Sequence, residues 1–436
     1  MMLPAHISLC IRTLEDTGFA AYAVGGCVRD SVLGLIPHDY DLCTAATPAE
    51  IRALFADFPL VLSGEKHGTV SVVMDHQLVE ITTFRTEGGY RDGRHPDWVR
   101  FETNIEADLS RRDFTVNAIA FSPTRGFADP FGGREDLKNH ILRCVGDPDT
   151  RFTEDALRIL RGVRFSVRYG LAVEKRTLDA MFRLAPLMDH LARERVMDEL
   201  MKLLPHVGAE DLLRFAPILT QIIPELAPCV GFDQHSPHHI YDVYAHTAHT
   251  VAAMPADPAL RLAALLHDIG KPAAFFLDDR GKGRFYGHDE AGADMANAVL
   301  LRLKASNELR HRVVHMIRHH MIPLTADKRL LRRRLNQWGL QGLQDQLAMQ
   351  TADRIGTGTG DTRELVQASA IIDELLAENA CFRLKDLAIN GHDLMALGFK
   401  GPAIGQCLSA LLEQVIDERI PNDPAALLDH AKTFKP

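Results

Sequence analysis

The sequence predicts an α+β protein, with strands near the N-terminus and helices over the remaining two thirds. Runs of β-branched and apolar residues separated by turn residues fill about the first 140 positions, which is typical of strands. Beyond about Ile141, apolar residues recur at spacings of three and four, the period of an amphipathic helix. At roughly 150 residues per domain, a chain of 436 residues is long enough for about three folding units.

The individual elements follow from these patterns and from turn signals. Strands are expected at residues 22–24, 60–62, 69–74, 78–84 and 115–121, and short helices at 31–35 and 48–55. Longer helices are expected at 154–169, 174–182, 193–204 and 260–267. A Gly/Thr run at 356–362 and a Pro-bearing stretch at 224–237 indicate loops. The predicted domains therefore cover residues 1–142, 143–225, 226–360 and 361–436.

Composition excludes several classes of protein. With 46% hydrophobic and 25% charged residues, the chain has too much core-forming material for disorder. It lacks an apolar run long enough to span a membrane and a signal peptide, so we expect a cytoplasmic protein without membrane contact. Seven scattered cysteines without a C-x-x-C pair predict reduced thiols rather than disulfides or a thiolate zinc site.

The charge is unevenly distributed. With 49 basic and 58 acidic residues the net charge is −9, which argues against a protein coated with phosphate-binding cations. Between residues 302 and 334, however, ten Lys/Arg stand against two acids. This basic stretch is compatible with a nucleic-acid partner or with a solvated helix face.

The first motif is a glycine pair after a predicted strand, in Gly25-Gly26-Cys27-Val28-Arg29-Asp30. Backbone N–H groups at such a turn can face an anion, and Arg29 adds a positive charge. Asp39-Tyr40-Asp41 follows, and in an extended segment its two carboxylates project from the same face. Mg²⁺ prefers oxygen ligands and accepts substrate phosphates in its shell. Each motif alone fits a simple turn or an exposed loop, but together they favour a metal and triphosphate site.

Two arginine-rich segments come next. Arg111-Arg112-Asp113-Phe114-Thr115-Val116-Asn117-Ala118 carries cations suited to a triphosphate tail. In Glu154-Asp155-Ala156-Leu157-Arg158, spacings of three place Asp155, Arg158 and then Arg161 along one helix surface. The side chains either form ion pairs on a solvated face or read a base. A carboxylate can accept a hydrogen bond from the amino group of cytosine or adenine, while an arginine donates one to the neighbouring acceptor atom of the base. Uracil and guanine carry a carbonyl oxygen in place of that amino group, so the carboxylate would repel them.

In series, these motifs strongly resemble those of the class II CCA-adding enzymes, tRNA nucleotidyltransferases of the bacterial poly(A) polymerase superfamily. The resemblance covers about the first 170 residues. It implies a small nucleotidyltransferase head with a mostly antiparallel sheet, followed by a helical neck, body and tRNA-binding tail, which we assign to the four predicted domains. It also implies tRNA as partner, CTP and ATP as substrates, and Mg²⁺ as cofactor.

By position, the resemblance implies that Asp39 and Asp41 are catalytic and bind Mg²⁺. The nucleotide-binding residues implied in the same way are Gly26, Arg29, Arg112, Asp155, Arg158, Arg161 and Arg164. The first three would hold the triphosphate, the next two would read the base, and the last two would support either the phosphates or the base-reading pair. Glu80 is either a third acid or a strand residue that faces solvent.

Two further segments resemble parts of the same family. The glycine- and charge-rich residues 85–97 are similar to the flexible loop that family members need for the final A, which favours full CCA addition. Residues 389–394 and 401–405 resemble the tail segment that contacts tRNA, with a pair of helix-joining turns as the alternative.

A histidine-rich set in the body resembles the metal-binding set of HD-domain phosphohydrolases, most clearly in His267-Asp268-Ile269-Gly270-Lys271. The implied ligands are His246, His267, Asp268, His288, His320 and Asp353, with His319 as an alternative to His320. Imidazole and carboxylate together suit a transition metal such as Ni, Co or Mn that activates water for phosphoester cleavage. A lone histidine is more often structural, but the ordered set favours a second, hydrolytic site.

We therefore expect template-independent addition of C, C and A to tRNA, with release of pyrophosphate at each step. The alternatives are an enzyme that adds A alone, a poly(A) polymerase, an HD phosphohydrolase with an RNA-binding head, and an RNA-binding scaffold. The oligomeric state stays open. The expectation depends on the acidic pair near position 40 and the acid–arginine pair near 157 meeting at one bound nucleotide.

Overall fold

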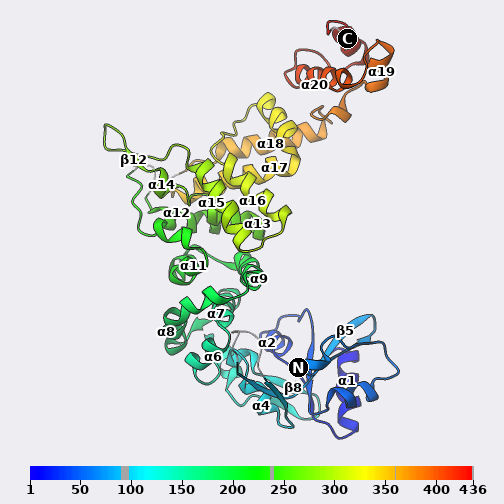
Figure 1. The fold of residues 1–436 in the computed structure, drawn as a ribbon, viewed down its shortest axis with the longest axis vertical. Helices are drawn as coiled ribbons and strands as arrows, with labels where there is room; N and C mark the ends of the chain where they lie inside the picture. Colours follow the sequence, from blue (N-terminus) through cyan, green and yellow to red (C-terminus); the bar gives the residue numbers. More distant parts are fainter. Residues whose placement is uncertain (90–97, 236–239, 359, 435–436) are drawn as a thin grey trace. The chain divides into compact units, whose positions relative to one another are not determined.

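The computed structural model describes residues 1–89, 98–235, 240–358 and 360–434, which form two compact units (Figure 1). The first unit comprises Met1–His206 with Arg214–Pro224, and the second comprises Val207–Leu213 with Glu225–Pro436. All the nucleotide motifs lie in the first unit, and the histidine-rich set lies in the second.

A seven-stranded sheet forms the centre of the first unit, in the order β3-β4-β5-β2-β1-β8-β9. Its strands are β1 (Ala21–Val24), β2 (Asp41–Thr44), β3 (Leu60–Val61), β4 (Thr69–Met74), β5 (Gln77–Thr83), β8 (Ala120–Ser122) and β9 (Gly126–Ala128). Neighbouring strands are antiparallel except β2 and β5, which run parallel, so the mostly antiparallel sheet is confirmed. Strand β2 lies in the interior of the sheet and begins at Asp41.

Helices and a hairpin complete the head. They are α1 (Ala5–Asp16), α2 (Gly26–Val32), α3 (Pro48–Leu54), α4 (Ile105–Ser110), α5 (Gly133–Lys138), β6 (Arg85–Gly88) and β7 (Trp98–Phe101). The sequence analysis missed α1, although its buried Ile7, Ile11 and Leu14 follow the helical period. The expected strand at 115–121 is wrong in its first half, because Thr115–Asn117 is a 3-10 turn. The helix expected at 31–35 instead begins at Gly26, directly after the glycine turn.

The neck of the first unit contains a short parallel strand pair, β10 (Ile141–Leu142) and β11 (Ala172–Val173), with two helices between these strands in the chain and the others after them. The neck helices are α6 (Pro148–Glu154), α7 (Leu157–Tyr169), α8 (Lys175–Leu184), α9 (Arg193–Leu203) and α11 (Ala216–Ile222). The prediction of one helix over 154–169 is wrong at its start, because Asp155 has extended backbone angles and separates α6 from α7. Helix α7 packs closely on the head: a Cβ on Gly162 would lie 2.9 Å from Cζ of Phe114.

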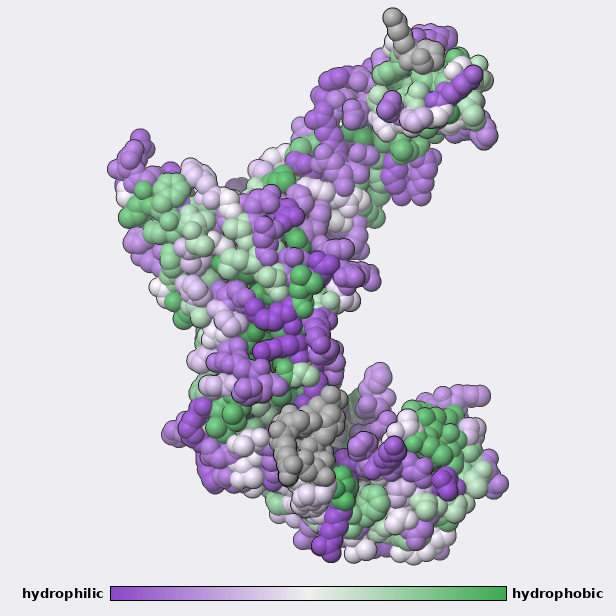
Figure 2. Space-filling view, viewed as in Figure 1, coloured by the Kyte–Doolittle hydropathy of each residue, from purple (hydrophilic) through white to green (hydrophobic). Residues whose placement is uncertain are grey.

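The second unit is almost entirely helical. Its elements are α10 (Ala209–Arg214), shared between the units in sequence, α12 (Val243–Ala253), α13 (Pro258–Leu266), α14 (Lys271–Ala274), β12 (Phe276–Leu277), β13 (Gly283–Arg284), α15 (His288–Arg302), α16 (Asn307–His319), α17 (Lys328–Gly356), α18 (Arg363–Ala377), α19 (Gly391–Ala396), α20 (Pro402–Ile416) and α21 (Pro424–Ala431). The loop expected at 356–362 is confirmed for its described residues from Thr357 onward, which connect α17 to α18, whereas Gly356 is still the last residue of α17. Figure 2 shows a hydrophobic patch near the β12–β13 hairpin, where Phe276 and Leu277 are exposed.

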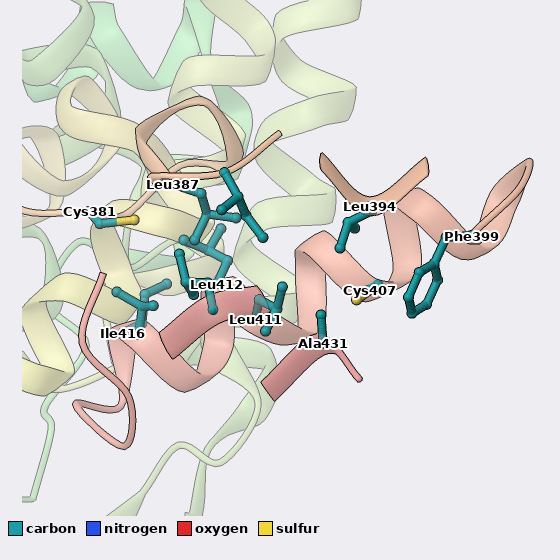
Figure 3. Close-up of a cluster of buried hydrophobic side chains, with 12 residues drawn as sticks. Cys381, Leu387, Leu394, Phe399, Cys407, Leu411, Leu412, Ile416 and Ala431 are labelled. Atoms are coloured by element: carbon teal, nitrogen blue, oxygen red, sulfur yellow. The ribbon is translucent and has the colours of Figure 1, made fainter. Parts of the chain in front are cut away.

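The C-terminal helices have a core of their own (Figure 3). Leu394, Phe399, Leu411 and Ala431 from α19, α20, α21 and their connections are buried together. The segments expected to contact tRNA include the starts of α19 and α20: Asn390 caps α19 with its side chain, and Gly401-Pro402 begins α20. These two segments therefore have a clear local structural role.

Two expectations from composition can be compared with the structure. All seven cysteines are buried, and none of them is paired with another in the structure. Within the described part of the chain, none of the helices is both long and apolar enough to cross a bilayer.

The basic stretch at 302–334 is largely neutralised by acids from other elements. Its ion pairs include Arg302–Glu225, Arg312–Asp345, Arg318–Asp294, Lys328–Glu378, Arg332–Glu418 and Arg333–Asp417. Counting residues along the sequence suggested a cationic surface, but acids distant in sequence face most of these cations. The structure favours the reading of a solvated, ion-paired helix face.

Candidate functional site

The glycine turn between β1 and α2 is closely covered by Arg112. Gly25 has a φ of +76°, a left-handed conformation that favours glycine. A Cβ at Gly25 would lie 3.0 Å from Nη1 of Arg112. The start of α2 and a guanidinium thus meet at one place, an arrangement that can bind an anion.

The predicted acidic pair lies beside this turn. Asp41 is exposed at the first position of β2, and its register partner on the parallel strand β5 is Glu80. Desolvation together with the neighbouring Asp39 and Glu80 carboxylates raises the pKa of Asp41, while Arg112 acts in the opposite direction. Glu80 is itself exposed, but its register places it next to the pair, which supports its reading as a third acid.

Arg29 lies in a more enclosed position than the sequence suggested. It is 5% exposed, and its guanidinium donates to Oδ1 of Asn117 and to the hydroxyl of Tyr169, both at 2.5 Å. It also pairs with Asp30 at 2.6 Å and lies over the ring of Tyr169. In this arrangement Arg29 joins α2 of the head to α7 of the neck.

A buried ion network continues from this point toward α9. Asn117 donates to Oδ1 of Asp113, and Arg161 binds the other oxygen of Asp113 at 2.7 Å. Burial opposes ionisation of Asp113, but the Arg161 charge and hydrogen bonds from Asn117 and Arg161 lower its pKa to about 2. Glu199 of α9 then pairs with Arg164 at 2.6 Å and approaches Arg161 at 3.8 Å. Arg161 and Arg164 therefore fix α7 between the head and α9.

The predicted base-reading residues lie on both sides of the break between α6 and α7. Asp155 does not lie on the same helix surface as Arg158, so that prediction is wrong: the helix is interrupted at Asp155. Its carboxylate binds Arg195 of α9, with Nη2–Oδ2 at 2.7 Å and Nη1–Oδ1 at 3.3 Å. Arg158 donates to Glu154 at 2.9 Å and to the carbonyl oxygen of Arg111 at 3.0 Å.

These contacts connect the two halves of the predicted nucleotide site. Arg158 binds the backbone of Arg111, and the next residue, Arg112, covers the glycine turn and influences Asp41. Arg111, which contacts Arg158, and Arg112, which contacts the glycine turn, are therefore adjacent in the chain, and they link the predicted base-reading residues to the predicted metal and phosphate residues. Of the predicted flexible loop, residues 90–97 lie outside the described part of the chain, and residues 85–88 form β6.

The histidine-rich set converges in the second unit. Five of its members form two overlapping groups of candidate metal ligands that share Asp268: one group is His246, His267 and Asp268, and the other is Asp268, His288 and His320. Asp353 approaches Nε2 of His246 at 2.9 Å and Nε2 of His267 at 3.5 Å. His320 lies in the cluster, whereas His319 binds the carbonyl oxygen of His315 and packs on Trp338, so the alternative ligand is wrong.

The backbone sets the direction of three of these rings. Nδ1 of His267, His288 and His320 lies within 2.8 Å of the carbonyl oxygens of Ala264, Phe285 and Ile317. With the proton on Nδ1, each Nε2 carries a lone pair. Nε2 of His288 and Nε2 of His320 lie 3.2 Å apart, and Nε2 of His267 lies 3.0 Å from Asp268. Such a concentration of electron pairs is typical of a metal-binding site.

A cavity opens onto this cluster. It has a volume of about 490 Å³ and is lined by Asp268, His288, His320 and Asp353, with the cations Lys271, Lys282 and Arg284 and the aromatic residues Phe285 and Tyr286. The amine of Lys271 also lies 2.6 Å from Asp268. The combination of candidate metal ligands and cations suits an anionic ligand.

Several residues of these sites carry no signal in the sequence. Arg195, Glu199 and Tyr169 are distant in sequence from the motifs they contact, and nothing in the helical period distinguishes them from surface residues. Lys271 belongs to the histidine motif, but its contact with Asp268 forms because the chain turns between Asp268 and the start of α14.

Comparison with known proteins finds similarity to domains of poly A polymerases and tRNA nucleotidyltransferases. Residues 21–143 match the poly A polymerase head domain, residues 170–230 the RNA and SrmB-binding site of polymerase A, and residues 290–431 domain 2 of tRNA nucleotidyltransferase. The CCA-adding enzyme of Latilactobacillus sakei is 34% identical, over 97% of this chain and 96% of its own length. That of Lactiplantibacillus plantarum is 35% identical, over 99% and 97%.

Solved structures agree with this fold. The crystal structure of the Bacillus stearothermophilus CCA-adding enzyme in complex with CTP superposes with a TM-score of 0.72 at 27% identity, covering 99% of this chain and 98% of that one. The Thermotoga maritima CCA-adding enzyme, solved in complex with tRNA, shares the fold with a TM-score of 0.61 at 20% identity, covering 98% and 94%.

Proposed function

The chain belongs to the family of CCA-adding enzymes, and from this membership we propose that it adds C, C and A in succession to the 3′ end of tRNA. In each addition the terminal 3′ oxygen of tRNA attacks the α-phosphate of CTP or ATP. The new phosphodiester bond forms as the bond to pyrophosphate breaks, and the proton of the hydroxyl leaves to solvent. The observation that carries the proposal is the position of Arg112 between the glycine turn and Asp41.

We assign the acidic residues to a Mg²⁺ site. Asp39, Asp41 and the neighbouring Glu80 offer only carboxylate oxygens, which fit Mg²⁺. The raised pKa of Asp41 supports this, because a cation would relieve the repulsion among these carboxylates. When bound, Mg²⁺ supplies charge neutralisation of the triphosphate and activation of the attacking hydroxyl.

The remaining residues bind and select the nucleotide. The N–H groups at Gly26 and the guanidinium of Arg112 hold the triphosphate, while Asp155 and Arg158 are assigned to the base. Reading the base requires the Arg158 guanidinium to exchange one of its present partners, which are Glu154 and the carbonyl oxygens of Arg151 and Arg111. Arg29, Arg161 and Arg164 act through the ion network, since each is committed to acidic or polar partners within the protein. Their contribution is to keep the neck helix α7 in register with the head.

Incubation with truncated tRNA tests the proposal most directly. With Mg²⁺, CTP alone should give two additions, and CTP with ATP should give three, read at single-nucleotide resolution. Homopolymeric A tails would indicate a poly(A) polymerase, and use of ATP only after C-C is already present would indicate an A-adding enzyme. Lack of any addition would contradict the proposal.

We propose a second activity for the histidine cluster, the metal-dependent hydrolysis of phosphoesters. The supporting observation is the pair of Nε2 atoms of His288 and His320 at 3.2 Å, neither of which has a proton to donate when Nδ1 binds a carbonyl oxygen. The ligand set of His246, His267, Asp268, His288, His320 and Asp353 mixes imidazole with carboxylate and fits a transition metal such as Ni²⁺, Co²⁺ or Mn²⁺. When bound, the metal supplies a water molecule of lowered pKa.

Metal analysis of the full chain tests this second activity. The purified protein should retain a transition metal and should cleave a chromogenic phosphodiester, and His267→Ala should lose both properties. His249→Ala is the matched control, because His249 lies on the same helix as His246 but stacks on Tyr241. Absence of hydrolysis with every metal, together with unchanged metal content in His267→Ala, would reduce the cluster to a structural role.

A further inference from the structure

We propose that Arg195 is a positioning residue for base selection, which holds Asp155 as a fixed hydrogen-bond acceptor toward the incoming nucleotide. This inference rests on the proposed function, since it assumes that Asp155 and Arg158 read the base. Arg195 lies on α9, outside all the motifs that the sequence analysis identified. Its side chain is 23% exposed and that of Asp155 is 16% exposed, so water competes only weakly for their contact.

Asp155 needs such a partner because of its place in the chain. It lies in the break between α6 and α7, where its φ of −146° and ψ of 100° end the first helix. Within the chain segment itself, only the N–H of Leu157 restrains the carboxylate, by donating to Oδ1 at 3.1 Å among the described residues. Arg195 adds a two-point contact to both oxygens at 3.3 and 2.7 Å. The planar guanidinium therefore fixes the orientation of the carboxylate plane.

The geometry leaves a defined part of Asp155 for the base. Each carboxylate oxygen can accept two hydrogen bonds. Oδ1 already accepts from Leu157 and Arg195, whereas Oδ2 accepts from Arg195 alone among the described residues. The remaining acceptor site on Oδ2 matches one amino group. Because a guanidinium only donates hydrogen bonds, Arg195 occupies a lone pair on each oxygen and leaves this one acceptor site in a fixed direction.

This property determines which bases fit. The amino groups of cytosine and adenine donate to an acceptor, while the corresponding carbonyl groups of uracil and guanine repel one. A carboxylate free to rotate would no longer hold this acceptor site in a fixed direction, so it would discriminate less strongly between those amino groups and carbonyl groups. Arg158 cannot take over the role of Arg195, because its guanidinium binds Glu154 and the carbonyl oxygens of Arg151 and Arg111.

The test is nucleotide discrimination by Arg195→Ala on truncated tRNA. We expect the ratio of kcat/KM for CTP to kcat/KM for UTP to fall by about 10-fold or more, because an unfixed polar group discriminates poorly. Arg195→Lys keeps the charge but lacks the two-point geometry, so its CTP/UTP ratio should lie between those of Arg195→Ala and the wild type. Arg193→Ala is the matched control: Arg193 lies on the same helix and donates to the carbonyl oxygen of Asp189, so its ratio should equal that of the wild type.

A double variant separates positioning from general damage. If Arg195 acts through Asp155, then Asp155→Asn and Asp155→Asn/Arg195→Ala should show the same CTP/UTP ratio. An equal loss of kcat/KM for CTP and UTP in Arg195→Ala, or an unchanged ratio, would overturn the proposal by making Arg195 only structural. If the wild-type chain adds neither C nor A, the proposed function fails instead, and the two failures are distinguishable in the same assay.

Discussion

The acidic residues of the head and the histidine-rich cluster of the second unit differ in how far neighbouring groups compensate the negative charge of their carboxylates. At the head, Asp41 is exposed, and desolvation and the Asp39 and Glu80 carboxylates raise its pKa despite the opposing charge of Arg112. In the second unit, Asp268 is buried, yet the amine of Lys271, 2.6 Å from its carboxylate, helps to hold its pKa well below the usual value. One site carries excess negative charge toward solvent, and the other compensates its charge within the protein.

The difference indicates how each site would hold a cation. Exposed carboxylates with uncompensated charge suit an ion that exchanges with each nucleotide, as Mg²⁺ does when it arrives with a triphosphate. Buried imidazoles with their Nδ1 atoms fixed by carbonyl oxygens suit an ion that remains bound, because ligand direction is set in advance. We therefore expect Mg²⁺ to wash out of the head and a transition metal to copurify with the second unit.

The largest predicted effect comes from Asp41→Asn compared with His267→Ala. Loss of a metal-binding carboxylate should lower nucleotide addition by at least about 10³-fold, because metal charge neutralisation is the main catalytic contribution. Phosphodiester hydrolysis should be unaffected. His267→Ala should show the reverse pattern, measured by the two assays on the same protein preparations. A parallel loss of both activities in either variant would contradict the independence of the two sites.

The second prediction concerns the ion network that attaches α7 to the head. Asp113→Asn leaves Arg161 and its neighbours without their buried counter-charge, so unfolding of the first unit should become easier by about 3 kcal/mol. Calorimetry measures the change, and deuterium exchange in residues 157–169 assigns it to α7. Asp149→Asn is the matched control, since Asp149 forms an exposed ion pair with Arg183 and should have little effect. Equal stability of the two variants would show that the network does not fix the neck.

The same residue predicts a pH dependence with a defined sign. The pKa of Asp113 is about 2 in the folded chain, below its usual value of 3.8, so its ionisation stabilises the folded state at neutral pH. This contribution, about 2 kcal/mol, is complete above the unfolded value and is lost as the pH falls toward 2. Calorimetry from pH 6 to 2.5 should therefore show the stability difference between wild type and Asp113→Asn shrinking. A constant difference would mean that Asp113 stabilises by packing alone.

Much of the head site could be predicted from the sequence because its motifs are local. The glycine turn and the alternating strand residues depend on near neighbours, so Gly25, Gly26, Asp39 and Asp41 lie where the pattern indicates. The same holds for the candidate histidine ligands, whose order along the chain indicated a set and which the structure brings together. The fold class also followed directly, because strand and helix periods differ.

What the sequence did not predict depends on contacts between distant segments. The helix break at Asp155 has no glycine or proline to mark it, and its partner Arg195 lies 40 positions further along the chain. Arg29 was expected to face a triphosphate, but Tyr169 and Asn117, remote in sequence, bind its guanidinium. A charged residue in a motif is expected to bind a group of opposite charge or a polar group, but the motif does not show which group this is.

The smallest predicted effect concerns the basic stretch, where the ion pairs argue against contacts with RNA. Arg333 pairs with Asp417 at 2.6 Å, as Arg329 does at 3.0 Å, so both guanidinium groups already have a counter-charge. A side chain that neutralises a phosphate contributes about one unit to the slope of log affinity against log salt concentration. We expect Arg333→Ala to leave the slope for tRNA binding unchanged, measured by filter binding across a salt series. Asp417→Asn frees both arginines and should leave the slope unchanged or increase it, whereas a slope that falls by a full unit in Arg333→Ala would mean that tRNA displaces Asp417 and binds this helix directly.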